Sequence, residues 1–158
     1  MFDPSEGLDD LERAIDKLTP ERPLDLPRLR RLADRLAAHF VHAVGAAERA
    51  GRLGGPNTGA ASALTDACRM PYAEASRLVE MAHAFEDLPV TSVAVLDGEI
   101  SLDHARVMTR ACTKARVDAF RDVEGQLVDM AKEWDVRPFA KRVKRLCDAV
   151  DGDDGVTA

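Results

Sequence analysis

Apolar residues recur at steps of three and four along most of this chain, which is the spacing of one face of an α-helix. No segment alternates between apolar and polar residues for long enough to predict a convincing β-strand. We therefore expect an all-α protein of about seven to eight helices. Breaks rich in Gly and Pro divide the predicted helices. The first covers about residues 5–18, a long second helix begins near residue 25, and two short helices lie within 62–85. The others cover about residues 89–96, 113–134 and 136–150, and one more begins near residue 101.

Two of the predicted helices are long, and each carries a continuous apolar stripe. The stripe of the helix that begins near Asp25 repeats like a coiled-coil seam over nearly three heptads, through Leu29, Ala33, Leu36, Phe40, Ala43 and Ala47. The stripe of the helix over 113–134 runs through Val117, Phe120, Val123, Leu127, Met130 and Trp134. We expect the two stripes to pack against each other, so that the long helices form an antiparallel scaffold. The first helix has a shorter stripe of Leu8, Leu11, Ile15 and Leu18.

The segment over about 62–85 has the size and spacing of a helix-turn-helix embedded in this scaffold. Arg69 stands where such turns often hold glycine, so we expect a positive φ there. Pro71 suits the first turn of the second helix, and Ala75 is small where the two helices cross. The residues expected to pack the two helices together are Leu64, Cys68, Leu78 and Val79.

In a helix-turn-helix the second helix can enter the DNA major groove, so its outward side chains are candidate DNA contacts. These are Tyr72, Ala73, Ser76, Arg77 and Glu80, of which Arg77 alone is a strong donor to phosphate or guanine. Glu74 and Glu80 repel phosphate unless they face away. A helical hairpin that touches no nucleic acid is therefore a nearly equal alternative.

Charge is spread unevenly along a chain whose net charge is −6. Residues 61–100, which hold the helix-turn-helix, carry 2 basic and 7 acidic groups, whereas residues 101–146 carry 11 and 7. The basic surface is thus expected outside the helix-turn-helix, on the outer face of the last helix. The candidate DNA-binding residues are Tyr72, Ser76, Arg77, Arg106, Arg137, Lys141, Lys144 and Arg145.

The length and composition favour one domain. With 158 residues, 46% hydrophobic residues and only 4% aromatic residues, the core must consist mostly of Leu, Val and Ala. We expect a single helical domain over residues 1–150 and a disordered acidic tail over 151–158. Neither a signal peptide nor a membrane-spanning segment is legible. Three widely separated cysteines, Cys68, Cys112 and Cys147, indicate buried thiols in a reducing cytoplasm.

Catalytic or metal-binding chemistry has little support in the sequence. His39 and His42 share a helix face but lack a Cys or carboxylate at ligand spacing, so we expect no metal and no other cofactor. His104, at the start of a helix, is most simply a capping or packing residue. No Ser–His–Asp or Cys–His order is legible, and no glycine-rich loop follows a strand. We therefore expect neither an enzyme nor a small-molecule substrate.

From about Leu29 to Asp154, the chain resembles domain-of-unknown-function family 222 (DUF222), the actinobacterial 13E12 repeat family. The matching features are the long Arg/Leu/Ala helix, the segments NTGAAS, EASRLVEMAHAFEDLP and GEISLDHARVM, and a basic last helix that ends in a D-x-D-D tail. Such domains often precede an HNH nuclease domain. The central part is also similar to the helix-turn-helix of ParB-type partition proteins, through Leu88-Pro89, Gly98, Ser101 and His104-Ala105-Arg106.

The ParB-type resemblance implies DNA binding, whereas the role of DUF222 domains themselves is largely unassigned. The turn carries Arg69 and Pro71 in place of the Gly and Ser usual in ParB-type proteins. No ββα-metal nuclease motif occurs before Ala158, so we expect an N-terminal fragment or a stand-alone relative without nuclease activity. The leading hypothesis is a cytoplasmic module that binds or positions double-stranded DNA and does not interact with membranes. The sequence leaves open whether it is a monomer or a homodimer, and a homodimer is the weak preference. The alternative is a protein-interaction or dimerisation module without nucleic-acid binding.

Overall fold

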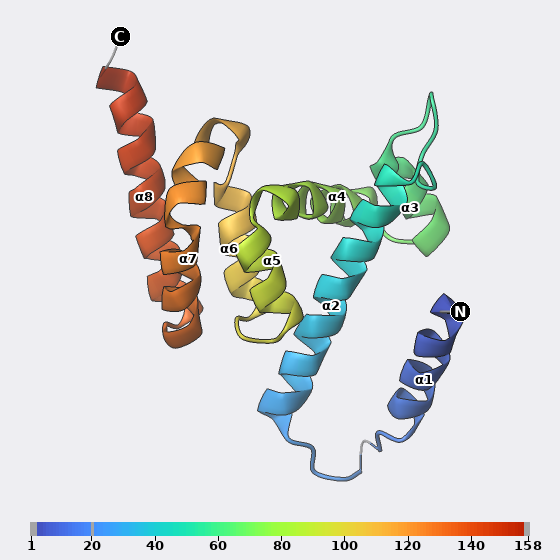
Figure 1. The fold of residues 1–158 in the computed structure, drawn as a ribbon. Coiled ribbons are helices and arrows are strands. Elements are labelled where there is room, and N and C mark those ends of the chain that lie inside the picture. Colours follow the sequence, from blue (N-terminus) through green and yellow to red (C-terminus); the bar gives the residue numbers. More distant parts are fainter. Residues whose placement is uncertain (1–2, 20, 157–158) are drawn as a thin grey trace.

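A computed structural model describes residues 3–19 and 21–156 of the chain and is all-α over that span (Figure 1). The expected fold class of seven to eight helices is confirmed, because the described residues form eight α-helices, one short 3₁₀-helix and no strand. In chain order these are α1 (Pro4–Asp16), α2 (Leu26–Arg49), α3 (Ala60–Cys68), α4 (Tyr72–Asp87), α5 (Pro89–Leu96), α6 (Leu102–Ala111), η1 (Lys114–Arg116), α7 (Val117–Glu133) and α8 (Val136–Val156).

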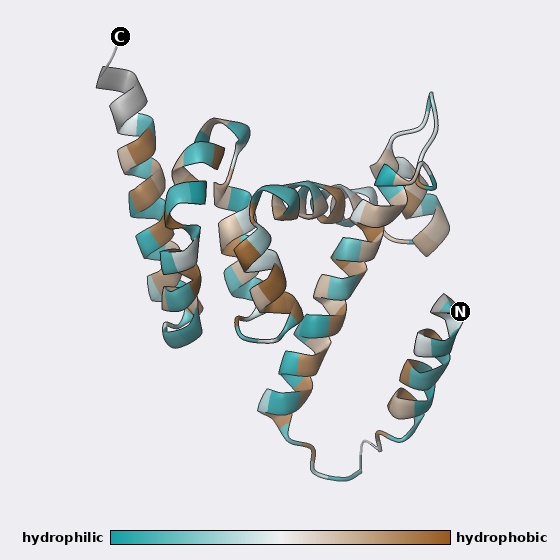
Figure 2. Cartoon of the chain, in the orientation of Figure 1, coloured by the Kyte–Doolittle hydropathy of each residue, from teal (hydrophilic) through white to brown (hydrophobic). Residues whose placement is uncertain are grey.

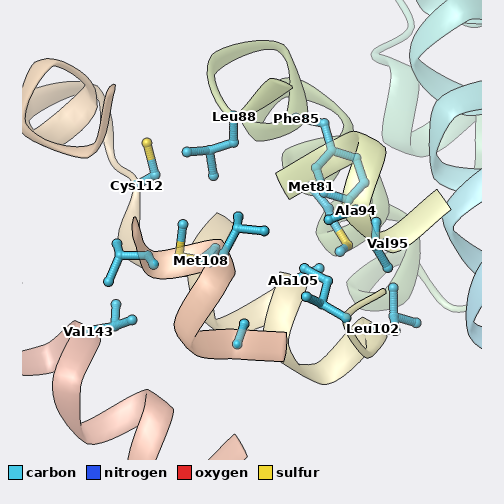
Figure 3. Close-up of a cluster of buried hydrophobic side chains, with 14 of the residues drawn as sticks. Met81, Phe85, Leu88, Ala94, Val95, Leu102, Ala105, Met108, Cys112 and Val143 are labelled. Carbon is cyan, nitrogen blue, oxygen red and sulfur yellow. The ribbon is translucent and has the colours of Figure 1, made fainter. Parts of the chain in front are cut away.

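The main core lies where α4 to α8 converge and continues onto one face of α2. Phe120 of α7 and Phe139 of α8 are fully buried, so two of the few aromatic side chains stand at its centre. Figure 3 shows Leu88, Met108 and Val143 directed toward one another from different parts of the chain. A smaller cluster joins α3, α4 and the end of α2. Burial of these apolar side chains is the main force that holds the short helices together.

The long helices do not form the expected antiparallel pair. α2 packs against α4, α5 and α6, whereas α7 packs against α5 and α8, so α5 separates the two. The buried face of α2 consists of Asp34, Ala38, Val41, Val44 and Gly45. Small residues on this face allow α4 to approach closely, since a Cβ at Gly45 would lie 3.4 Å from the Cβ of Ala82. Helix packing therefore selected the small-residue face and left the heptad stripe outside.

The predicted stripe of α2 is consequently a surface feature. Leu36 is 44% exposed and Phe40 is 40% exposed, and Ala33 and Ala43 are exposed as well. The predicted stripe of α7 is correct at Phe120 and Leu127, but Trp134 is 40% exposed.

The last helix is longer than the sequence indicated. α8 ends at Val156 instead of Val150, so residues 151–156 are helical where a disordered tail was expected, and residues 157–158 lie outside the described span. Two hydrogen bonds from the Arg116 guanidinium to the carboxylate of Asp151, at 2.6 and 3.0 Å, attach this end of α8 to η1. The same contact lowers the pKa of Asp151 from its ordinary value. A tertiary ion pair thus stabilises the continuation of α8 into a segment whose local sequence is polar and rich in Gly.

Candidate functional site

α3 and α4 are joined by a three-residue turn, Arg69 to Pro71, and pack against each other. Leu64, Ala75 and Val79 are buried between the two helices, as expected, together with Val44 of α2. Cys68 is exposed, so the expectation that it packs the two helices together is wrong. It is the last residue of α3, where the helix ends and its side chain stays in solvent.

The turn between the helices depends on a left-handed residue. Arg69 has φ 54° and ψ 42°, which confirms the positive φ expected from the sequence. Pro71 is the N-cap of α4 and lies just before the first turn in which the sequence placed it. The left-handed conformation is strained for a residue with a Cβ, so this turn is maintained by the packing on either side of it.

Arg69→Gly is expected to stabilise the protein by about 0.5–1 kcal/mol, because glycine adopts this conformation without steric cost. Urea unfolding followed by circular dichroism measures the change. Arg121→Gly, at an exposed position inside α7, is the control and should destabilise by about 1 kcal/mol. Stability that falls in both variants would show that Arg69 makes a favourable contact that outweighs its strain.

The outward face of α4 is poorly suited to DNA. Tyr72 is 59% exposed and Arg77 is exposed, but Ser76 is half-buried. Arg77 shares its face with Glu74 and Glu80, and all three line one groove. An Arg between two carboxylates contributes little affinity for DNA, because the carboxylates repel the phosphate groups.

This groove has a volume of about 1210 Å³ and lies between α2, α4 and α6, with α1 at its margin. Leu36 and Phe40 of α2, Met81 of α4 and Val107 of α6 supply much of its apolar lining. Arg106 also lines the groove, as Arg77 does. Its guanidinium, however, is bound to Asp103 at 3.2 Å.

The four candidates on α8 form a separate surface. Arg137, Lys141, Lys144 and Arg145 are all exposed and lie opposite the buried face of Phe139 and Val143. α8 packs against α6 and α7 at one end of the molecule, whereas α3 lies at the other end (Figure 1). The predicted site residues therefore lie on separate surfaces: Arg77 and Arg106 line the groove, Tyr72 and Ser76 lie on α4 outside the groove lining, and the other four lie on α8.

The Gly-x-x-Ser-x-x-His run has a structural role. Ser101 is the N-cap of α6, and its hydroxyl accepts a hydrogen bond from the backbone N–H of His104. The ring of His104 is buried, with Nδ1 2.6 Å from Ser101 Oγ and Nε2 2.7 Å from the carbonyl oxygen of Trp134. Nε2 donates to that carbonyl and so joins α6 to the end of α7. This confirms the packing role expected for His104.

Two buried carboxylates were not singled out by the sequence. Asp34 of α2 accepts hydrogen bonds from Arg30 Nε at 3.0 Å and from the backbone N–H of Leu102 at 3.1 Å. Glu124 of α7 accepts from the N–H and hydroxyl of Thr91, at 2.7 and 2.8 Å. Each carboxylate thus satisfies the free N–H groups at the start of another helix. The sequence could have indicated that Glu124 is buried, because helical spacing places it on the same face of α7 as Phe120, Leu127, Val128 and Ala131.

The titratable side chains of Cys112 and His42 have structural surroundings and no catalytic ones. Burial, with Asp87, Glu124 and Cys147 nearby, raises the pKa of Cys112 to about 11, so its thiol stays protonated and unreactive. Burial, together with His39 and Arg49, lowers the pKa of His42, whose Nε2 lies 2.8 Å from Ser92 Oγ. Among the described residues, no three His, Cys, Asp or Glu side chains are placed to hold a metal ion.

A protein-family model for a domain of unknown function, DUF222, matches residues 24–157 of the chain. The chain belongs to the DUF222 family. Comparison with curated proteins and with solved structures finds no match. The matched span contains α2 to α8, so α1 precedes the family domain.

The DUF222 match agrees with the sequence resemblance in both family and extent. It describes a domain without an assigned activity, so the function must be argued from the surfaces of this DUF222 domain. None of the described helices is long and apolar enough to cross a membrane.

Proposed function

We propose that this DUF222 domain binds double-stranded DNA in the cytoplasm through the phosphate backbone, with the exposed basic face of α8 as the principal contact. The observation that carries the proposal is the row of Arg137, Lys141, Lys144 and Arg145 on a chain that is otherwise acidic. Among the described side chains, Lys144 alone in this row has an acidic partner, Asp148 at 3.7 Å. Unpaired cations in a row favour a polyanion.

The spacing of the row suits a phosphate backbone. Arg137 and Arg145 are eight residues apart, which is about 12 Å along an α-helix. Long side chains on that span reach several successive phosphates of one strand, and such contacts position a protein without reading sequence. The proposal gives a smaller part to Tyr72, Ser76, Arg77 and Arg106, because Glu74, Glu80 and Asp103 lie among them.

The family resemblance also motivates a wider role. We extend the proposal to a non-catalytic, DNA-positioning part of an HNH endonuclease-like protein, because DUF222 domains often precede HNH domains. In that role α3 and α4 support the fold, and α8 supplies affinity. Nothing in this role requires a reaction at the domain itself.

Replacing Arg137, Lys141 and Arg145 together by Glu is expected to weaken binding to a mixed-sequence duplex on the order of 100-fold at low salt. Fluorescence anisotropy from about 50 to 200 mM salt also measures the slope of log K against log salt. We expect a slope of about −3 to −4 for the wild-type chain and a much shallower one for the variant.

The control reverses three exposed basic residues elsewhere, through Lys17→Glu, Arg22→Glu and Arg52→Glu. Both variants have the same net charge, so only the location of the charge differs. Equal loss of binding in the two variants would contradict a specific role for α8 and leave only general electrostatic attraction.

A second candidate function, protein interaction, is favoured by a different observation. The groove between α2, α4 and α6 is mostly apolar and open, and the surface beside it also carries exposed leucines. Exposed apolar surface of this extent commonly marks a binding site for another protein.

A further inference from the structure

The exposed apolar residues of this chain are concentrated in its N-terminal part. Of the twelve exposed large hydrophobic residues among those the structure describes, eight lie in α1, α2 or the segment between them. They are Leu8, Ile15, Leu18, Leu24, Leu26, Leu32, Leu36 and Phe40. In Figures 1 and 2, α1 stands beside α2, apart from the other helices, and both helices carry hydrophobic residues. A soluble domain rarely leaves such a concentration uncovered.

The floor of the groove is a helix-binding surface. Ala33, Leu36, Phe40 and Ala43 of α2 line it at steps of three and four, which is the spacing of a and d positions in a coiled coil. Leu78 and Met81 of α4 form one wall, and Val107 of α6 contributes to the other. Two large residues lie between two alanines here, so the stripe offers space beside Leu36 and Phe40 for the side chains of another helix.

α1 and the segment just after it have the matching pattern, and the described residues of α1 have no tertiary packing of comparable extent. Leu8, Leu11, Ile15 and Leu18 repeat at steps of three, four and three. Leu8 is the one described side chain of α1 that lines the groove of its own chain. Leu8 and Ile15 remain 68% and 51% exposed, and Leu18, just beyond α1, remains 46% exposed. A 13-residue helix is about 20 Å long, similar to the α2 stripe from Leu29 to Phe40.

We propose that this protein forms a homodimer in which α1 of each copy lies in the α2–α4–α6 groove of the other. Residues 17–25 join α1 to α2 and extend to about 30 Å, enough to reach a neighbouring copy. Because α1 makes few contacts with its own chain, its exchange breaks little that the monomer holds. The exchange is independent of DNA binding by α8.

The exposed area suits a dimer. At about 200 Å² for a fully exposed large side chain, the five of these residues that belong to the proposed contact, Leu8, Ile15, Leu18, Leu36 and Phe40, expose roughly 500 Å² per chain. Two chains together then bury roughly 1,000 Å², which is the lower end of a specific interface. Charge does not oppose the contact, since the groove margin carries three arginines, Arg77, Arg106 and Arg110, and three acids, Glu74, Glu80 and Asp103. The polar face of α1, with five acids and one base, therefore meets a balanced surface.

Sedimentation of the full chain from about 1 to 100 μM tests the dimer. The wild-type chain should sediment at twice its mass of 17.2 kDa. Leu36→Glu/Phe40→Glu should give a folded monomer, because both residues are exposed in the single chain. Val90→Glu/Val93→Glu, at 46% and 56% exposed positions of α5, is the control and should remain dimeric. A monomeric wild-type chain, or a dimeric groove variant, overturns the proposal.

A mixing experiment identifies the helix that occupies the groove. Leu8→Glu/Ile15→Glu should also be monomeric, since it removes two anchors of α1. Mixed with the groove variant, it should form a heterodimer that retains one intact contact between helix and groove. A mixture that stays monomeric overturns the exchange. A monomeric wild-type chain with α1 protected from hydrogen exchange would place α1 in its own groove and overturn it as well.

Discussion

Ala75→Asp is expected to remove at least about 4 kcal/mol of stability and to prevent cooperative folding at ordinary temperature. Ala75 is fully buried where α3 and α4 meet, among Val44, Leu64 and Val79. The surrounding cluster is apolar, so a carboxylate there loses its hydration without a partner. Its two extra oxygens also exceed the space left by a methyl group and force the helices apart.

Ala73→Asp is the matched control for this change. It makes the same substitution two residues earlier, at an exposed position in the first turn of α4. An acid near a helix N-terminus is favourable, so this variant should be neutral or slightly more stable. Urea unfolding by circular dichroism compares the two. If both variants lose similar stability, the cost belongs to the acidic character of α4 and not to the crossing at Ala75.

The features that the sequence predicted well are determined by local interactions. The turn at Arg69 and the crossing at Ala75 depend on a few adjacent residues, and both were expected before the structure. The start of α6 is similar, because Ser101 caps a helix whose third residue supplies the N–H it binds. Such local preferences survive in the fold because tertiary packing reinforces them.

The features that failed are determined by tertiary packing. α2 carries two stripes at helical spacing, and hydropathy favours the one with Leu36 and Phe40 over the one with Ala38 and Gly45. Close approach by α4 required the small residues, so the more hydrophobic stripe lies outside. The partner of α7 was wrong for a related reason, since α5, an eight-residue helix, occupies the place assigned to α2.

The candidate site could be predicted as a set of residues but not as a surface. The basic residues of α8 were recognised from their position opposite Phe139 and Val143, and they are exposed. The distance between α8 and the α4 face depends on how α6 packs against both α4 and α8, which no local pattern encodes. The groove was not predicted either. The stripe of α2 that lines it has the pattern of a buried helix contact, and that pattern does not show that the stripe faces an open groove.

Buried acids are the clearest case in which pattern and packing disagree. Glu124 is 4% exposed, at a position of α7 where a helical pattern calls for an apolar residue. It is retained because the N-cap of α5, Leu88, is buried and has no side-chain oxygen to satisfy the first N–H groups. The carboxylate from α7 does so at Thr91, which is itself fully buried. A negative charge there also complements the positive end of the α5 dipole.

Glu124→Ala is therefore expected to cost about 3–5 kcal/mol, because it leaves the N–H and the hydroxyl of Thr91 buried without an acceptor. Glu124→Gln keeps one acceptor oxygen and should cost about 1–2 kcal/mol. Asp122→Ala removes an exposed acid from the same helix and should change stability by less than about 0.5 kcal/mol. Urea unfolding measures all three. If Gln and Ala prove equally costly, the charge at the start of α5 matters more than the two hydrogen bonds. If Ala is tolerated like Asp122→Ala, the N-terminus of α5 does not depend on Glu124.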